Sequence, residues 1–346
     1  MPRALVTGAT GLVGSYIVDR LVTDGWSVHA LVRAPHTQLA WRDVEPVAGD
    51  ILDADAFASA AKGCDTIFHA AAAVTPRGGW EAYRRPNVDG AANAVLAAER
   101  SGARLLQVSS VAVYGPEGRY RGPGQRTDES TPLASLPERA YYARSKRESE
   151  ELVLAAHAAG RIWATAVRPT VIYGRRDRQF VPRMARFLSR GVAPIIGGGR
   201  ATFAIVHAAN VAHGAVLAAS NDAAAGRAYN ISNDGDVSVR RFFELAAQGM
   251  GRRERLVPIP MWLARGGFAA LRFAAKHLTG GRMSVLSNAS LSFLTESDPF
   301  SSDRARRELG WSPVVRPEEG IPDAFRWWAE HAANDQSASA TSTRLS

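Results

Sequence analysis

The sequence predicts an α/β fold in which a doubly wound parallel sheet is followed by a smaller, mostly helical C-terminal domain. Two observations carry this prediction. Up to residue 170, apolar segments of strand length alternate with helical patterns, which is typical of a parallel sheet covered by helices. After residue 174 helical segments prevail. We expect a dinucleotide-binding domain, a substrate-binding domain and a disordered tail, formed respectively by 1–173 with 201–232, 174–200 with 233–333, and 334–346.

The first predicted strand, residues 4–7, ends in the glycine-rich turn GATGLVG (8–14), and a helical pattern follows as far as residue 25. Gly8 permits a tight turn, Gly11 lets a pyrophosphate approach the backbone, and Gly14 allows the helix to pack closely on the strand. The phosphates would bind the N–H groups at the start of the helix. This is a Rossmann-like dinucleotide site, and we count Thr10 and Leu12 of the same turn among its residues.

The second predicted strand, WSVHALVR (26–33), bears on the choice of cofactor. Folds that prefer NAD usually end this strand with an acidic residue that binds the ribose 2′-hydroxyl. Arg33 stands there instead, 19 residues after Gly14. Because a guanidinium can bind a 2′-phosphate through two hydrogen bonds, the sequence favours NADP over NAD as the cofactor.

Tyr142 and Lys146 lie four residues apart in YYARSK (141–146), where a helical pattern begins that runs to residue 159. This spacing places both side chains on one helical face. A phenol has a pKa of about 10, and a neighbouring ammonium lowers it. We therefore expect Lys146 to lower the pKa of Tyr142, and Tyr142 to exchange a proton with an alcohol or a ketone. With only three lysines in the chain, the pair is improbable by chance.

The spacing G-x-x-G-x-x-G, with Tyr-x-x-x-Lys about 130 residues later, resembles the extended short-chain dehydrogenase/reductase family (the NAD-dependent epimerase/dehydratase superfamily) over roughly residues 3–330. The resemblance implies that Ser110, in LLQVSSVAVYG (105–115), orients the reacting oxygen. It implies that Tyr142 is the general acid/base and that Lys146 also binds the nicotinamide ribose. Asn87 matches a structural asparagine of the family.

The resemblance also implies further cofactor contacts. Asp50 and Ile51, in GDILD (49–53), would contact the adenine, while Asp53 is expected to cap the next helix. Ala70 and Ala71 lie in the loop after DTIFH (65–69), which passes under the cofactor. Pro169 lies in VRPTVIYG (167–174), which lines the nicotinamide. We interpret His69 as a buried packing residue rather than a catalytic one.

The segment MWLARGGFAALRFAAKHL (261–278) gives the main indication of the substrate. Arg265, Arg272 and Lys276 form a basic stripe on a helical pattern that is otherwise apolar. Such a helix can lie on a membrane surface, but we expect it to pack on its own domain. The layout resembles the 3β-hydroxysteroid dehydrogenase-like branch, which implies an apolar substrate with a secondary alcohol or ketone, steroid- or sterol-like or 3-ketoacid-like.

Composition excludes several other classes of protein. The net charge is +9, but the basic residues are spread along the chain, so we expect no nucleic-acid partner. Cys64 is the single cysteine, and no Cys/His cluster has metal-ligand spacing. No signal peptide and no membrane span are apparent, so we expect a cytoplasmic protein. The resemblance implies a homodimer built from helices such as 87–101 and 142–159.

Two other functions remain open. A nucleotide-sugar 4-epimerase or dehydratase with bound NAD would use the same Tyr–Lys pair and would bind a second pyrophosphate with arginine, for which Arg175, Arg183 and Arg200 are candidates. The apolar segment 261–278 argues against such a polar ligand. A cofactor-sensing regulatory protein without turnover is the third possibility, although such proteins tend to lose the Tyr or the Lys, and both are present here.

Overall fold

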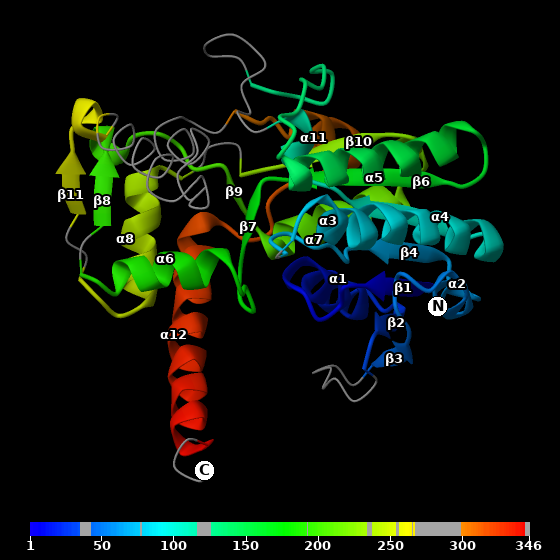
Figure 1. Ribbon diagram of the computed structural model, residues 1–346, viewed down its shortest axis with the longest axis horizontal. Helices are drawn as coiled ribbons and strands as arrows, with labels where there is room; N and C mark the ends of the chain where they lie inside the picture. The colour runs from blue at the N-terminus through cyan, green and yellow to red at the C-terminus, as the bar shows by residue number, and fades with distance from the viewer. Residues whose placement is uncertain are drawn as a thin grey trace. The chain divides into compact units, whose positions relative to one another are not determined.

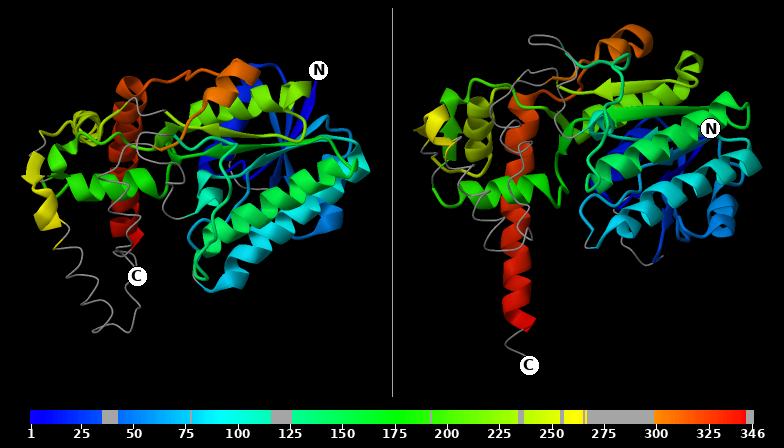
Figure 2. Two further views of the ribbon diagram at one scale, coloured as in Figure 1. Left: turned by 90° about the horizontal axis from the view of Figure 1, so that it is seen from above. Right: turned by 45° about the horizontal axis from the view of Figure 1, so that its top comes forward.

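A computed structural model describes residues 1–34, 43–76, 78–115, 126–191, 193–233, 237–253, 256–264, 266 and 299–342. The chain forms two compact units (Figures 1 and 2). The first comprises 1–172, 208–232 and 300–314, and the second comprises 173–207, 233–299 and 315–346. Residues 300–314, which we expected in the second domain, therefore belong to the first, and 201–207 belong to the second.

The first unit is built on a seven-stranded parallel sheet in the order β10-β6-β5-β4-β1-β2-β3 (Figure 1). The order reverses between β1 and β4, which is where a doubly wound sheet binds its ligand. The predicted fold class is thus confirmed. The strands are β1 (Arg3–Thr7), β2 (Ser27–Val32), β3 (Val44–Ala48), β4 (Thr66–His69), β5 (Arg104–Val108), β6 (Ala164–Pro169) and β10 (Ala228–Ile231).

Helices cover both faces of this sheet, as its apolar strands require. On one face α1 (Leu12–Thr23) packs against α7 (Ala208–Ser220), and on the other α4 (Gly90–Ser101) lies between α2 (Ala54–Ala61) and α5 (Tyr141–Ala158). Figure 2 shows α4 and α5 side by side. The shorter elements of this unit are α3 (Trp80–Arg84), η1 (Arg85–Asp89), η2 (Val111–Tyr114), η4 (Asp222–Ala224) and α11 (Asp303–Leu309).

Local capping explains where some of these elements begin. The side chain of Asp53 accepts hydrogen bonds from the N–H groups of Asp55 and Ala56, so the predicted cap of α2 is confirmed. Asn210 lies inside α7. There its Oδ1 accepts the N–H of Val314, and its carbonyl accepts the indole N–H of the buried Trp311. Asn210 therefore holds the chain after α11 rather than a helix end.

The second unit has a core of its own, in which several aromatic rings pack against aliphatic side chains. The rings of Phe203 and Phe242 lie 4.9 Å apart, and Phe325 packs edge-on against Phe242. Its strands β8 (Ala193–Ile196) and β11 (Leu256–Ile259) pair in parallel. The other elements are α6 (Phe180–Leu188), η3 (Gly197–Gly199), β9 (Ile205–His207), α8 (Val239–Gly249) and α12 (Pro317–Ser342), and β7 (Val171–Tyr173) spans the boundary between the units.

Three expectations for the second half differ from the structure or lie outside it. Residues 205–207, which we expected in the dinucleotide-binding domain, form β9, and β9 pairs with β7 rather than with the seven-stranded sheet. Helix α12 extends to Ser342, so the tail that we expected to be disordered from residue 334 is helical that far. Of the segment 261–278, only 261–264 and 266 are described, so its basic stripe lies outside the described residues.

Candidate active site

The glycine turn joins β1 to α1 with little space for side chains. Gly8 has φ +69°, and its carbonyl accepts the N–H of Gly11 at 2.8 Å. A Cβ on Gly14 would lie 2.1 Å from the carbonyl oxygen of Gly8. Thr10 and Gly11 are exposed, and no side chain caps the first turn of α1. A bare, exposed helix start of this kind fits a pyrophosphate, as the sequence predicts.

The loop after β4 packs directly beneath this turn. A Cβ on Gly8 would lie 2.8 Å from the backbone nitrogen of Ala71 and 3.0 Å from the carbonyl carbon of Ala70. The N–H of Ala71 donates to the hydroxyl of Thr7 at 3.2 Å, and this hydroxyl lies 2.9 Å from Nδ1 of His69. Burial, with the charge of Lys146 as the smaller cause, lowers the pKa of His69 to about 3. A neutral, buried His69 supports its interpretation as a packing residue.

The other residues that we expected to bind the cofactor lie at the same edge of the sheet. Arg33 directly follows β2 and is exposed. The carboxylate of Asp50 accepts the N–H of Leu52, which fixes the turn after β3. Ile51 packs on Gly90, and its carbonyl accepts the amide of Asn93. Pro169 is the last residue of β6 and is buried.

Asn87 ties the loop after β4 to the helix that carries Tyr142 and Lys146. It is buried in η1, a π-helical turn, and such turns occur often at functional sites. Its Oδ1 accepts the N–H of Ala73 at 2.7 Å, and its Nδ2 donates to the carbonyl of Ala73 and to Oγ of Ser145. The structural role that the resemblance implied for Asn87 therefore has a physical basis in three hydrogen bonds.

Ser110 and Tyr142 come together although they are far apart in sequence. Ser110 caps the start of η2, where its Oγ accepts the N–H of Ala112, and its hydroxyl lies close enough to Tyr142 to influence the pKa of the phenol. Burial raises the pKa of Tyr142, and the hydroxyl of Ser110 acts in the opposite direction with a smaller effect. Tyr142 is therefore a neutral phenol at pH 7, able to give a proton to an oxygen placed beside Ser110.

We expected Lys146 to lower the pKa of Tyr142, but burial raises that pKa, and the charge of Lys146 is not among the causes that act on the phenol. Lys146 is buried, and its ammonium donates to the carbonyl of Val108 at 2.6 Å. Burial lowers the pKa of Lys146 to about 8, against a smaller upward effect of Glu150. The phenol has a raised pKa because its own desolvation outweighs its favourable contacts. Tyr142 and Lys146 nevertheless share the inward face of α5, as their spacing predicts.

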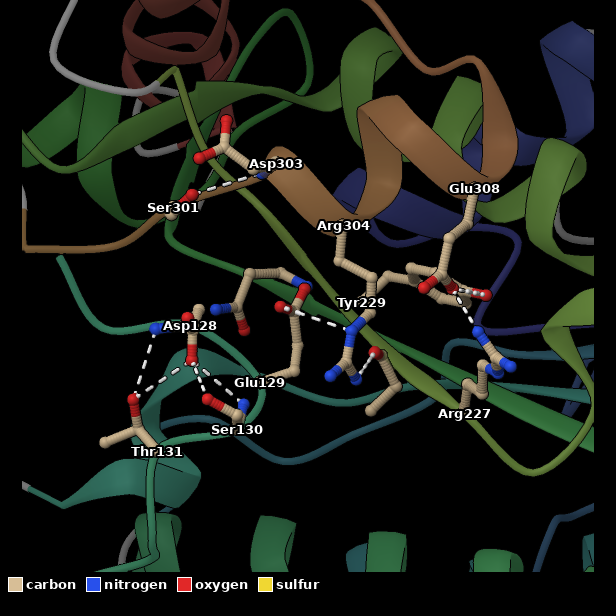
Figure 3. Close-up of polar contacts among 12 residues, drawn as sticks. Asp128, Glu129, Ser130, Thr131, Arg227, Tyr229, Ser301, Asp303, Arg304 and Glu308 are labelled. Carbon is tan, nitrogen blue, oxygen red and sulfur yellow. Dashed lines mark hydrogen bonds and ion pairs between the residues drawn. The ribbon is translucent and has the colours of Figure 1, made fainter.

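The segment that precedes α5 is fixed to the edge of the sheet (Figure 3). Asp128 accepts hydrogen bonds from the N–H and the hydroxyl of Ser130. Glu129 accepts the N–H of Asn230 in β10 at 2.7 Å and lies 3.7 Å from Nε of Arg304. Its side chain is 2% exposed, and burial raises its pKa. Sequence reasoning missed this anchor at Glu129.

Sequence reasoning also missed the ionic partner beneath Lys146. Glu150 lies four residues after Lys146 and forms a buried ion pair with Arg168 of β6. The spacing from Lys146 to Glu150 was a usable signal, since two charged residues on the inward face of a helix need partners. Arg168 offered no comparable signal in a chain with so many arginines.

Within the part of the chain that the structure describes, no group of three or more His, Cys, Asp or Glu side chains could hold a metal ion. Among the same residues, no helix combines the length and the apolar character needed to cross a bilayer.

Comparisons with known proteins agree with this geometry. Residues 4–232 match the NAD dependent epimerase/dehydratase family. The chain is 31% identical, over 94% of its length and 96% of the other protein, to the 4-hydroxy-2-methyl-3-oxo-4-farnesyl-3,4-dihydroquinoline-1-oxide ketoreductase of Stigmatella aurantiaca. It is 28% identical to a 3 beta-hydroxysteroid dehydrogenase/Delta 5-->4-isomerase of Mycobacterium tuberculosis, over 99% and 95% of the two chains. The crystal structure of gox2253 has a TM-score of 0.77 and 26% identity, and the match covers 96% of this chain and 99% of that one.

Proposed function

The chain belongs to the NAD dependent epimerase/dehydratase family, and we propose that it interconverts a ketone and a secondary alcohol on an apolar substrate, with NADP as its preferred cofactor. The observation that carries the proposal is the buried Lys146, which lies one helical turn along α5 from Tyr142 and whose ammonium donates to the carbonyl of Val108. The hydroxyl of Ser110 lies close enough to Tyr142 to lower the pKa of the phenol against the larger effect of burial. The chain is an oxidoreductase of the extended short-chain dehydrogenase/reductase type.

Each residue of this group has a distinct role in the proposed reaction. Ser110 binds the carbonyl oxygen of the substrate and places it beside the phenol of Tyr142. The phenol gives its proton to that oxygen during reduction and takes it back during oxidation. Lys146 places a positive charge on the same face of α5, which stabilises the phenolate that remains. When bound, the nicotinamide supplies or accepts the hydride at the carbonyl carbon.

Substrate and cofactor are inferred from different observations. Relatives named as a ketoreductase of a farnesylated quinoline oxide and as a hydroxysteroid dehydrogenase support an apolar ketone, steroid- or sterol-like or 3-ketoacid-like. The exposed Arg33 at the end of β2 supports NADP, since a guanidinium binds a 2′-phosphate. Residues 8, 10–12 and 14 would hold the pyrophosphate, and those at 70–71 and 169 would line the dinucleotide further along.

The test is turnover in both directions with a matched variant. We expect NADPH to be consumed with a panel of apolar ketones and NADP to be reduced with hydroxysteroids. Replacement of Tyr142→Phe should lower kcat by roughly 100-fold or more, because general acid–base catalysis is lost, while cofactor binding stays within about threefold. Full activity in Tyr142→Phe would refute the assignment of the proton donor.

The epimerase or dehydratase alternative has a different signature in the same experiment. Such an enzyme would carry tightly bound NAD after purification and show no net redox turnover. One of its candidate pyrophosphate ligands, Arg175, is paired with Asp323 at 2.7 Å in the second unit. An arginine already engaged by a carboxylate is a poorer anion ligand, which supports the reductase over this alternative.

A further inference from the structure

A buried ion pair lies one helical turn beyond Lys146. Glu150 follows Lys146 on the inward face of α5, and its carboxylate accepts two hydrogen bonds from Nε of Arg168, at 3.0 and 3.1 Å. The Arg168 and Glu150 side chains are only 9% and 4% exposed. Desolvating two charges costs several kcal/mol, so that a buried pair is weak grounds for expecting stability. A role beyond stability is therefore worth seeking.

Arg168 also contacts the element that carries Ser110. Its Nη1 donates to the hydroxyl of Tyr114 at 2.8 Å, and Tyr114 ends η2, the turn that Ser110 begins. The Tyr114 hydroxyl lies 3.1 Å from both the carbonyl of Asp128 and Oδ1 of Asn230. One guanidinium thus joins α5, which carries Tyr142 and Lys146, to the turn that carries Ser110.

We propose that Glu150 and Arg168 are positioning residues of the active site. The carboxylate of Glu150 keeps Lys146 in its ammonium form, and the guanidinium of Arg168 fixes the Ser110 turn against α5. The effect of the pair on catalysis rests on the proposed function, whereas the charge of Lys146 can be measured without any turnover.

The charges around Lys146 support the role proposed for Glu150, which is to keep Lys146 in its ammonium form. Among the described residues, Glu150 on α5 and the neutral His69 at the end of β4 interact with the charge of Lys146, and Arg168 of β6 is hydrogen-bonded to Glu150. Burial disfavours the ammonium, and the carboxylate of Glu150 opposes that effect. Without this carboxylate, the unpaired charge of Arg168 would add to the effect of burial, and Lys146 would lose its proton nearer to neutral pH.

The direct test is the titration of Lys146 by NMR. The chain has three lysines (Lys62, Lys146 and Lys276), so lysine labelled with ¹³C at Cε gives few signals, and Lys146→Met assigns the one of interest. We expect Glu150→Gln to move the titration of Lys146 down by about one pH unit or more. Glu151→Gln, at the exposed neighbouring position on α5, should leave it unchanged. An unchanged titration in folded Glu150→Gln overturns the charge role.

A second variant covers the case in which Glu150→Gln does not fold. Replacing Glu150→Gln and Arg168→Met together leaves no unpaired charge, and such double replacements of buried pairs are often tolerated. Because Glu150 acts on Lys146 more strongly than Arg168 does, the titration should still move down, though by less than in the single variant. A titration equal to that of the native protein in this double variant overturns the charge role as well.

Kinetics separate the two roles of the pair. Tyr114→Phe removes the hydrogen bond from Arg168 to η2, together with the contacts of the same hydroxyl with Asp128 and Asn230. It leaves Glu150 in place, so kcat should fall roughly tenfold while the titration of Lys146 is unchanged. In Glu150→Gln the alkaline limb of the pH profile should move with the titration. Native kcat in Tyr114→Phe overturns the positioning of the Ser110 turn. If no ketone is turned over by the native protein, the proposed function fails, whereas the NMR titration still decides the charge role.

Discussion

Replacing Gly14→Ala tests whether the close contact of α1 with the β1 turn forms the cofactor site. Gly14 has ordinary helical backbone angles, so the substitution brings no conformational strain of its own. Its new Cβ would lie 2.1 Å from the carbonyl oxygen of Gly8 and 2.6 Å from the carbonyl carbon. Both are backbone atoms, so no side-chain rotation can relieve the clash.

The size of the effect follows from this distance. The new Cβ and the carbonyl oxygen must separate by about 1.3 Å before they reach ordinary contact, so α1 must move away from the turn that we expect to bind the phosphates. Overpacking of this kind costs about 1–3 kcal/mol of the free energy of unfolding. A cofactor that binds through the displaced N–H groups should lose about 1.4 kcal/mol or more, which is a tenfold rise in its Kd.

Two measurements on each variant decide the matter, namely urea unfolding and calorimetric titration with NADPH. Gly79→Ala is the matched control, because a Cβ there meets nothing within 4 Å and the residue has a negative φ. It should change the unfolding free energy and the Kd only slightly. If Gly14→Ala bound NADPH with native affinity, the assignment of this turn to the pyrophosphate would be refuted.

Two further predictions concern charge. Arg33→Asp should raise the Kd for NADPH about tenfold or more and change the Kd for NADH little, because a carboxylate repels a 2′-phosphate. The control Arg307→Asp makes the same change at an exposed position of α11 and should affect neither Kd. Equal losses of affinity for both cofactors in Arg33→Asp would contradict the role of Arg33. Burial raises the pKa of Glu129, so the folded protein holds the proton of this carboxyl more tightly than the unfolded chain does. The contribution of Glu129 to the free energy of unfolding is therefore complete below pH 4.5 and is lost as the pH rises through the raised pKa. Glu129→Gln can still accept the N–H of Asn230 and should therefore gain stability relative to the native protein between pH 4 and pH 8 in urea unfolding. A constant difference between the two proteins across this range would show that the carboxylate is not destabilised.

Much of the fold and the cofactor site could be predicted from local patterns. The turn GATGLVG between a strand and a helix specifies close backbone packing, and Gly8 and Gly14 meet as that pattern requires. The spacing of Tyr142 and Lys146 placed both on the inward face of α5 because helical periodicity is a short-range property. Boundaries between the units were less predictable, since the return of 300–314 to the first unit depends on contacts such as that of Trp311 with Asn210.

The fold class, the phosphate-binding turn and the candidate residues Ser110, Tyr142 and Lys146 could be identified from the sequence, because each depends on spacing within one or two elements. The ionisation of these groups could not be predicted in this way, because it depends on how the folded chain buries them. The pKa of Tyr142 is raised and that of Lys146 is lowered by burial under segments that are distant in sequence. The pairing of Glu150 with Arg168 likewise joins α5 to β6, and no local pattern encodes which strand a buried helix face will meet.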